Sequence, residues 1–473
     1  MKKYILIILC CLTSFPLWSY NVNMIVEHYS VDQGLPNNTV NCTLKDRDGF
    51  IWFGTWYGLC CFDGVKFKTF NKQEHDSDVP PRKIQRIVED KNGYIWVKTI
   101  DRKLYVFNKV TECFHAVYDD MKNYSENIQV IKLQNTAEGD VLLLTKDKNL
   151  LLAGVDEKGQ VTIKILFDSR DEINKHDYTL KHHVLCETEE YISWIGTDYK
   201  VSAVHKGAEL ASRPADFITS KINSGDKDSF TSFFEDGRKV WVGDRAGIFY
   251  SIDVRTGLVN RYVLSEIKGA ISNLLVTPAG YVYLSVAGQG TYEYDLAERR
   301  LQKINTEMND AMVTHAFIDQ YDKIWFHENE KALIYYDPLN HTAKRFPFTM
   351  FGKITTLYSE DAGERGLFFL SPAGEAWLFD REHAEMVYIN KLKQLSNDRA
   401  NQQFYHLMLD NDGVLWLSSA DEGVYCMNFP KKQFNLLSLS PQSAGQENYT
   451  IGVRALFQSK SGDIWVGTRW QSV

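Results

Sequence analysis

One short block of sequence, Ile-Trp-Phe-Gly-Thr at residues 51–55, returns along the whole chain in degenerate form. Each copy places a tryptophan beside aliphatic residues, and four of the copies continue with glycine. The copies lie at residues 51–55, 95–99, 194–197, 240–243, 324–326, 415–418 and 464–468. The steps from one of these tryptophans to the next are 44, 98, 47, 84, 91 and 49 residues. Such regular self-similarity indicates a repeat architecture.

The three long steps are close to twice the short ones, so a unit without tryptophan is expected near the middle of each. Apolar runs do occur there, at residues 141–143, 282–284 and 367–369. The chain therefore contains ten units with a period in the mid-forties.

Each unit predicts several short strands. In the first unit, runs rich in β-branched and aromatic residues cover 40–44, 50–55, 58–62 and 67–70. Asp48-Gly49 is a hairpin signal, since glycine accepts a positive φ without steric cost. The same turn recurs as Asn92-Gly93, Glu138-Gly139, Asp236-Gly237, Ala279-Gly280, Asp412-Gly413 and Ser461-Gly462. Four strands in a unit of this length predict an all-β chain built from the four-stranded blades of a β-propeller.

The repeated tryptophan is interpreted as a packing residue that fills the wedge between neighbouring blades. The glycine that follows it, at Gly54, Gly196, Gly243 and Gly467, is expected to allow close approach between inner strands. None of these residues needs to take part in chemistry.

Charge and targeting signals limit the classes of function. The formal net charge is −8, so nothing predicts a nucleic-acid interface, which needs a basic patch. Lys2 and Lys3, followed by the apolar stretch 4–12 and small or polar residues near Ser19, predict a signal peptide over residues 1–20 and export to the periplasm. No later stretch is long and apolar enough for a membrane span.

The sequence contains no motif that predicts a cofactor or a metal site. The six cysteines after the leader include no Cys-x-x-Cys pair, and they are interpreted as buried free thiols. No Gly-x-Ser-x-Gly elbow or glycine-rich phosphate loop is present. His182 and His183 point to opposite faces of a predicted strand, which does not favour shared metal binding. We therefore expect a protein that is not an enzyme and has no cofactor or catalytic residues.

The blocks at residues 34–40, 48–55, 58–59 and 62–64 resemble the two-component regulator propeller repeat. That resemblance covers nearly all of the mature chain, with the first unit and residues 453–468 as the best matches. It implies the periplasmic sensor region of a Bacteroidota hybrid two-component system. Members of that family sense glycans or their breakdown products and switch on polysaccharide-utilisation genes. The kinase and DNA-binding parts of such a system are absent from these 473 residues.

In that family two seven-bladed propellers lie in tandem, and ten units do not fit one ordinary propeller. The expected division is a seven-bladed ring over 24–350 and a partial second propeller of about three blades over 351–473. An eight-plus-two split is the alternative. We accordingly expect a truncated sensor, and expect that a chain ending near residue 350 is more soluble than the whole.

Binding residues are expected in the loop that follows each Trp-Gly-Thr block, because loops on a rigid scaffold carry function. Aromatic faces with neighbouring polar groups suit sugar rings. The candidates are Trp56, Tyr57, Asp198, Tyr199, Asp244, Arg245, Asn329, Glu330, Arg469 and Trp470.

The leading hypothesis is a periplasmic module that binds an oligosaccharide without altering it. The resemblance also implies a homodimer for the full-length sensor, with membrane attachment only through missing C-terminal segments or an uncleaved leader. A secreted propeller glycosidase or lyase and a protein-interaction scaffold are the alternatives. The ligand, the disulfides and the oligomeric state are not encoded in any local pattern.

Overall fold

The computed structural model describes residues 25–70, 80–121, 129–146, 149–167, 180–188, 190–196, 201–206, 215–216, 230–304, 313–328, 331–351, 358–361, 363, 366–371, 375–389, 404–428, 453–459 and 464–468. The chain divides into two compact units, Met1–Phe429 and Pro430–Val473. Strands and tight turns account for nearly all of the described residues, which confirms the predicted all-β class. The few helical turns are η1 (Val31–Gln33), α1 (Tyr118–Met121) and η2 (Phe348–Phe351). The predicted signal peptide lies outside the described residues.

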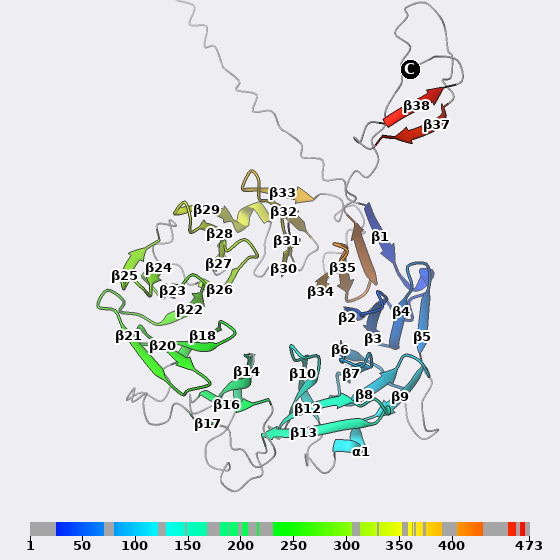
Figure 1. Cartoon of the computed structure of the whole chain (residues 1–473), viewed down its shortest axis with the longest axis horizontal. Coiled ribbons are helices and arrows are strands. Elements are labelled where there is room, and N and C mark those ends of the chain that lie inside the picture. Colours follow the sequence, from blue (N-terminus) through cyan, green and yellow to red (C-terminus); the bar gives the residue numbers. More distant parts are fainter. Residues whose placement is uncertain are drawn as a thin grey trace, which may run out of the picture. The chain divides into compact units, whose positions relative to one another are not determined.

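Each repeat of the first unit folds into one antiparallel sheet, named here blades 1 to 9 (Figure 1). Blade 1 is β2 (Val40–Lys45), β3 (Ile51–Thr55), β4 (Gly58–Phe62) and β5 (Phe67–Phe70). Blade 2 is β6 (Ile84–Glu89), β7 (Ile95–Thr99), β8 (Leu104–Asn108) and β9 (Cys113–Ala116). Blade 3 is β10 (Val130–Asn135), β11 (Val141–Thr145), β12 (Leu150–Val155) and β13 (Val161–Phe167).

Blades 4 to 6 continue the pattern. Blade 4 is β14 (Leu180–Glu187), β15 (Tyr191–Gly196), β16 (Val201–His205) and β17 (Ala215–Asp216). Blade 5 is β18 (Phe230–Glu235), β19 (Lys239–Asp244), β20 (Ile248–Asp253) and β21 (Val259–Val263). Blade 6 is β22 (Ile271–Val276), β23 (Tyr281–Val286), β24 (Gly290–Asp295) and β25 (Arg300–Lys303).

Blades 7 to 9 complete the first unit. Blade 7 is β26 (Val313–Ile318), β27 (Ile324–Glu328), β28 (Ala332–Asp337) and β29 (Thr342–Pro347). Blade 8 is β30 (Tyr358–Asp361), β31 (Leu367–Leu370), β32 (Ala376–Asp380) and β33 (Glu385–Ile389). Blade 9 is β34 (Phe404–Leu409), β35 (Leu415–Ser419), β36 (Val424–Asn428) and β1 (Ile25–Tyr29). The predicted four-stranded blade and the position of tryptophan on its second strand are confirmed.

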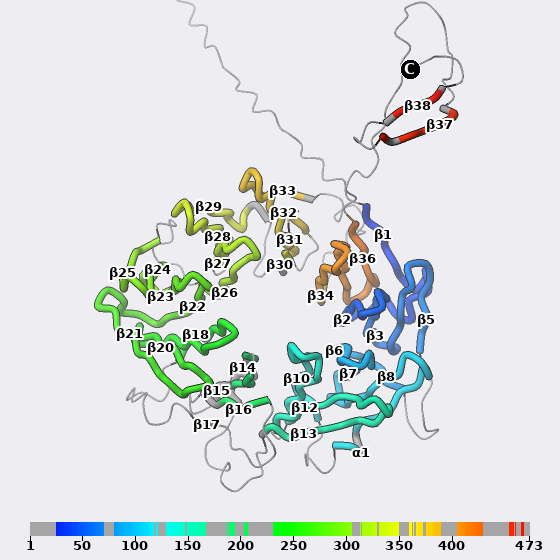
Figure 2. Tube along the Cα trace, viewed as in Figure 1, coloured from blue at the N-terminus to red at the C-terminus, as the bar shows by residue number. Residues whose placement is uncertain are grey.

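The N-terminal strand completes the last of these sheets. β1 pairs antiparallel with β36, with Ile25 opposite Asn428 and Tyr29 opposite Val424. Blade 9 also packs on blade 1, since Trp416 and Val424 share an apolar core with Phe53 and Cys60. The first unit is therefore a closed β-propeller in which β1 lies beside the strands of blade 9 (Figure 2).

The expected seven-bladed ring over 24–350 is not confirmed. Among the described residues the closed unit holds nine four-stranded sheets. The expected boundary at residue 350 falls inside a shared core, where Trp325 and Phe346 of blade 7 pack on Phe369 and Phe379 of blade 8. The physical reason is the partner of β1, which lies about 400 residues away in sequence at β36.

The cores lie between the blades, and the tryptophans fill them. Trp52 lies in the core that blade 1 shares with blade 2, and Trp96 in the core that blade 2 shares with blade 3. Trp241 and Trp325 face the next blade in the same way. Together with Trp416, these side chains are at most 5% exposed. The packing role predicted for the repeated tryptophan is confirmed at these five positions.

An aspartate carboxylate orients each of these five indoles. Asp46 is the first case: one oxygen accepts the indole N–H of Trp52 at 2.7 Å, and the other accepts the amide N–H groups of Asp48 and Phe50. One carboxylate thus fixes both the hairpin turn and the ring. The corresponding pairs are Asp90–Trp96 at 2.9 Å, Asp236–Trp241 at 2.7 Å, Asp319–Trp325 at 3.2 Å and Asp410–Trp416 at 3.1 Å.

The glycine after the tryptophan lies on the second strand of its blade and allows that strand to approach the first strand of the next blade closely. A Cβ atom at Gly54 would lie 2.5 Å from the Sγ atom of Cys42 and 2.5 Å from a methyl carbon of Ile84 on blade 2. Gly243 is equally confined by Ser232 and Ile271. The close approach predicted for this glycine is confirmed at both positions.

The second unit contains the tenth repeat as a hairpin of β37 (Val453–Gln458) and β38 (Ile464–Thr468). Phe457 and Trp465 lie opposite each other in this pair and are 66% and 57% exposed. No helix among the described residues of either unit is long and apolar enough to cross a bilayer.

The carboxylate–indole pair predicts a specific stability effect. Replacing Asp90 with alanine removes the acceptor of the buried indole N–H of Trp96, of two turn amides and of the Val155 amide, which should lower the free energy of unfolding by about 3 kcal/mol. Asp156→Ala is the matched control, because Asp156 accepts the same two kinds of turn amide without an indole. It should cost about 1 kcal/mol. Urea unfolding monitored by circular dichroism measures both; equal losses would contradict the role of the indole bond.

Ring closure reverses the solubility expected from the sequence. A protein ending at residue 350 would expose the blade 7 face around Trp325 and leave β1 without β36, so it should aggregate. A protein ending at residue 429 keeps every blade of the first unit and should melt within about 2 °C of the full chain. Size-exclusion chromatography and thermal unfolding compare the three proteins. A monodisperse protein ending at 350 would show that closure through β36 is not needed.

Candidate functional site

Of the binding residues predicted from sequence, the four that the structure describes lie on two different blades. Trp56 and Tyr57 form the β3–β4 turn of blade 1 and are 41% and 64% exposed. Asp244 and Arg245 lie at the β19–β20 turn, on a different blade. The remaining candidates, Asp198, Tyr199, Asn329, Glu330, Arg469 and Trp470, lie outside the described residues.

Asp244 has a structural role in its turn. Its carboxylate is buried, accepts the amide N–H groups of Ala246 and Ile248, and accepts the hydroxyl of Tyr250. Burial raises the pKa of this carboxyl, and the three hydrogen bonds oppose that rise. Asp244 is therefore a turn residue whose carboxylate oxygens already accept hydrogen bonds. Arg245 beside it is exposed.

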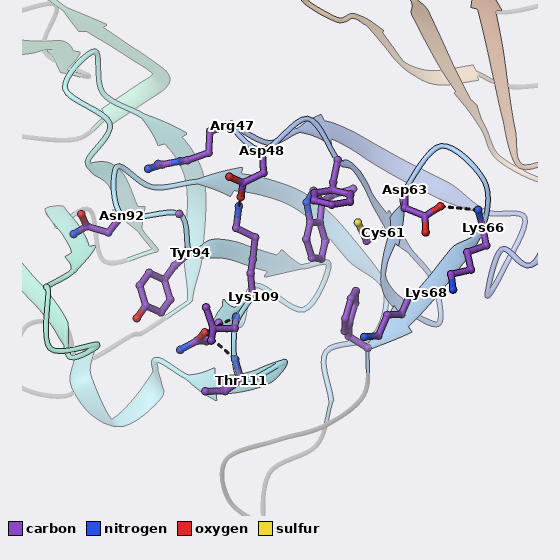
Figure 3. Close-up of a pocket in the computed structure, with 16 residues that line it drawn as sticks. Arg47, Asp48, Cys61, Asp63, Lys66, Lys68, Asn92, Tyr94, Lys109 and Thr111 are labelled. Atoms are coloured by element: carbon purple, nitrogen blue, oxygen red, sulfur yellow. Dashed lines mark hydrogen bonds and ion pairs between the residues drawn. The ribbon is translucent and has the colours of Figure 1, made fainter.

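A cavity of about 830 Å³ lies between blades 1 and 2 (Figure 3). It is formed by the β2–β3 and β4–β5 turns of blade 1 and the corresponding β6–β7 and β8–β9 turns of blade 2. It lies at the start of β3, whereas the predicted residues Trp56 and Tyr57 follow the end of that strand. The lining residues are Arg47, Asp48, Phe50, Trp52, Cys61, Asp63, Lys66, Lys68, Phe70, Asn92, Gly93, Tyr94, Asn108, Lys109, Val110 and Thr111.

Aromatic rings and polar groups alternate around this cavity. The ring of Phe50 is 42% exposed, and Tyr94 is half-buried on the blade 2 side. Trp52 stacks on Phe70 with their ring centroids 5.4 Å apart. Burial and the carboxylates of Asp46 and Asp63 raise the pKa of the Cys61 thiol to about 12, so this thiol is not a nucleophile at neutral pH.

Lys109 is the ionic centre of one wall. Its ammonium lies 3.0 Å from Asp46, 2.7 Å from Asp48 and 2.8 Å from Glu89, and Figure 3 shows it reaching toward Asp48. Burial alone would lower the pKa of Lys109, but hydrogen bonds to the three carboxylates raise it. Conversely, the ammonium lowers the pKa of Asp48. Lys109 is therefore charged at neutral pH.

This arrangement accounts for an acidic group that resembles a metal site. Oxygen atoms of Asp46, Asp48 and Glu89 lie within 4.8 Å of one another, the one such group found in the part of the chain that the structure describes. The ammonium of Lys109 contacts all three carboxylates and supplies the positive charge that a cation would bring. The group is thus an internal ion-pair cluster.

Ion pairs of the same kind join other neighbouring blades, which indicates a structural role. Lys206, which follows the third strand of blade 4, bonds Glu138 of blade 3 and Glu187 of its own blade. Arg381, which follows the third strand of blade 8, bonds Asp319 of blade 7 and Asp361. We call this contact the basic bridge: a basic residue directly after a third strand, paired with an acid on the preceding blade. This contact was not predicted, although a basic residue directly follows the third strand in blades 2, 4 and 8.

Comparison with known proteins gives one family profile that matches part of the first blade. The profile of the family described as two component regulator propeller matches residues 34–57, which run from η1 to the β3–β4 turn. The chain carries a two component regulator propeller repeat. The match confirms, for residues 34–57, the resemblance seen in the sequence of the first repeat. A search of curated proteins finds no match to the chain.

Solved structures similar to this repeat protein include sensors and an enzyme. One is the extracellular domain of BT4673 from B. thetaiotaomicron, described as a one component system, with 14% identity and a TM-score of 0.36 over 92% of this chain and 68% of that one. Another is the extracellular domain of BT3049 from B. thetaiotaomicron, described as a hybrid two component system, with 16% identity and a TM-score of 0.30 over 93% and 76%. Virginiamycin B lyase from Staphylococcus aureus has 9% identity and a TM-score of 0.36 over 85% and 99%. The propeller fold stated above rests on the strand pairing of this chain.

The basic bridge predicts a strong effect of removing Lys109. Lys109→Met leaves three carboxylates close together, two of them nearly buried, and should lower the free energy of unfolding by about 3 kcal/mol. Lys68→Met is the control, because the ion pair of Lys68 with Glu112 is exposed at both ends. It should cost less than about 1 kcal/mol. Thermal and urea unfolding measure the stability of both variants. A Lys109→Met protein as stable as the control would mean that the cluster does not hold blades 1 and 2 together.

Proposed function

We propose that this chain is the periplasmic sensor region of a hybrid two-component system and that it binds an oligosaccharide to control polysaccharide-utilisation genes. The two component regulator propeller repeat at residues 34–57 supports the assignment to signal transduction. The observation that carries the ligand assignment is the cavity between blades 1 and 2.

The chemistry of the cavity suits a sugar. Phe50 and Tyr94 supply ring faces on opposite blades, against which the C–H faces of a sugar ring can stack. Lys66 supplies an ammonium group and Asn92 a carboxamide oxygen near those rings, and sugar hydroxyls form directed hydrogen bonds with such groups. A volume of about 830 Å³ has room for a short oligosaccharide.

The carboxylates of the cavity favour binding over hydrolysis. A glycosidase needs one carboxyl whose pKa is raised so that it can donate a proton. Here Lys109 lowers the pKa of Asp48, and amide hydrogen bonds from Lys66 and Val65 lower the pKa of Asp63. Neither lining acid is therefore protonated at neutral pH, and the proposal is a sensor without catalytic activity.

Ligand binding across two blades offers a route to signalling. A ligand shifts a conformational equilibrium only if it binds the two states differently. The cavity is shared by turns from blades 1 and 2, so the packing of these blades alters the site. In a homodimer of the full-length sensor, a change in blade packing would reach the partner and then the kinase.

Substitution of two exposed aromatic residues can distinguish binding in the cavity from binding at the loops predicted from the sequence. Phe50 in the cavity and Trp56 on the β3–β4 turn are 42% and 41% exposed, so their removal disturbs folding to a similar small extent. Isothermal titration calorimetry with a panel of plant and host glycan fragments should identify a ligand for the wild-type protein. Phe50→Ala should weaken that ligand about tenfold, the loss of about 1.4 kcal/mol of stacking, while Trp56→Ala leaves affinity unchanged.

The opposite pattern would move the site to the loops after the Trp-Gly-Thr blocks. Absence of heat with every fragment, from protein with a cooperative unfolding transition, would contradict the oligosaccharide assignment. Chromatography of the same mixtures tests the enzyme alternative, since new sugar products that vanish in an Asp48→Asn variant would contradict a pure sensor.

A further inference from the structure

Two like charges lie directly opposite each other on the first two strands of blade 2. Arg86 of β6 is the register partner of Lys98 of β7. Such a pair destabilises a sheet, because cross-strand side chains at opposed positions lie close together. Arg102, in the turn after β7, is the third member of this cluster. The three residues are referred to below as the cationic cluster.

The unfavourable electrostatic free energy of this cluster is greatest at Lys98. Its side chain is only 7% exposed, and its ammonium donates a hydrogen bond to the carbonyl of Ile131 on blade 3. Burial, followed by the charges of Arg102 and Arg86, lowers the pKa of Lys98 to about 8. A buried ammonium is ordinarily tolerated only when it is paired with an acid.

No such acid is present in the part of the chain that the structure describes. None of the ion pairs among the described residues involves Arg86, Lys98 or Arg102. Asp101, the acid next to Arg102 in sequence, is bonded instead to the hydroxyl of Thr99 and to Lys103. The contrast with the basic bridges is direct, since Lys109, Lys206 and Arg381 each contact at least two carboxylates.

The cluster is also open to solvent. Arg86 and Arg102 are exposed, so their guanidinium groups can take a ligand. The charge of Arg86 is felt by His406 of β34, whose pKa is lowered to about 4 by burial and then by Arg86. The charge of Arg86 also opposes the rise in the pKa of the Cys42 thiol on β2, so its electrostatic effect reaches the first strands of blades 9 and 1. The Nδ1 atom of His406 is buried and has no hydrogen-bond partner there.

We propose that Arg86, Lys98 and Arg102 form a binding site for an oxyanion: a carboxylate, sulfate or phosphate group. Two guanidinium groups can each bind an oxyanion through paired N–H donors, and the ammonium of Lys98 adds a compact charge from the buried side. A bound anion supplies a counter-charge that none of the ion pairs among the described residues gives to these three side chains.

The oxyanion site is separate from the cavity proposed for the oligosaccharide. The cavity lies at the turn before β7, next to Tyr94, whereas Lys98 and Arg102 lie at the other end of that strand. The oxyanion site therefore does not depend on the sensor assignment. Its ligand is either a free inorganic anion or the acidic substituent of a larger molecule, such as a uronate or a sugar sulfate.

Stability measurements test the site without a known natural ligand. The melting temperature of the full chain is measured with millimolar sodium sulfate, sodium phosphate, glucuronate or glucose 6-sulfate, against sodium chloride and neutral glucose at equal ionic strength. At least one oxyanion should raise the melting temperature by about 2–4 °C, as expected for a ligand that binds only the folded state. Calorimetric titration with the same compounds confirms the binding.

Two variants and a control identify the cluster as the site. Lys98→Met should raise the melting temperature in chloride, because repulsion and desolvation are removed, and should abolish the shift given by the anion. Arg86→Gln, at an exposed position that tolerates change, should weaken anion binding at least fivefold without unfolding the protein. Lys103→Met, which removes a neighbouring lysine paired with Asp101, should leave the anion shift intact.

The outcomes separate the sources of the anion. A shift with inorganic sulfate or phosphate supports a free anion, and a shift with glucuronate or glucose 6-sulfate alone supports an acidic sugar. No shift with any of the four would overturn the proposal. So would a Lys98→Met protein that melts lower in chloride and keeps the wild-type anion shift. Phe50→Ala must not alter the anion shift, which keeps this test apart from that of the oligosaccharide cavity.

Discussion

The hydrogen bond from an aspartate carboxylate to a buried indole is the contact on which the propeller is built. Because one carboxylate holds both the β2–β3 type of turn and the ring, the turn and the face presented to the next blade cannot vary independently. Blades 3 and 6 are two of the three blades whose second strand has no tryptophan, and in both the turn begins with a threonine whose hydroxyl accepts the same turn amide, as at Thr136 and Thr277. In these two blades the turn is kept, although both the tryptophan and the aspartate that would bind its indole are absent.

Local patterns were sufficient to predict the repeat unit. Strand-rich runs, Asp-Gly or Asn-Gly turns and the position of Trp52 in β3 depend on neighbours within one blade, so they are readable from sequence. Closure is different, because the pairing of Ile25–Tyr29 with Val424–Asn428 joins two strands that carry no mutual signal. Counting units gave ten, and the structure places them as nine sheets and one hairpin in two compact units. The number of blades in one ring is set by how neighbouring blades pack against each other, and the sequence of a single repeat does not encode that packing.

The candidate site was harder to predict for a related reason. Sequence reasoning placed binding at the β3–β4 type of turn, where aromatic and charged residues such as Trp56 and Arg245 stand out. The cavity lies at the opposite end of the strands and is assembled from four turns of two blades. Its wall depends on Lys109 reaching across to Asp46 and Asp48, and such contacts between blades are invisible in a linear pattern. Asp244 stands out in the sequence as a loop acid, but in the structure it is a buried residue that holds its own turn.

The pairing of β1 with β36 also has a consequence for how the protein reaches its native state. The strand that emerges first during synthesis or export waits for the strand at residues 424–428, because both belong to one sheet. Bringing them together closes a loop of about 400 residues, and contacts of such long sequence separation form late and slowly. Until then the open ends of the blade series present unpaired strand edges. Closure of the ring therefore requires the last blade, and the pairing of β1 with β36 is expected to limit how fast the ring forms.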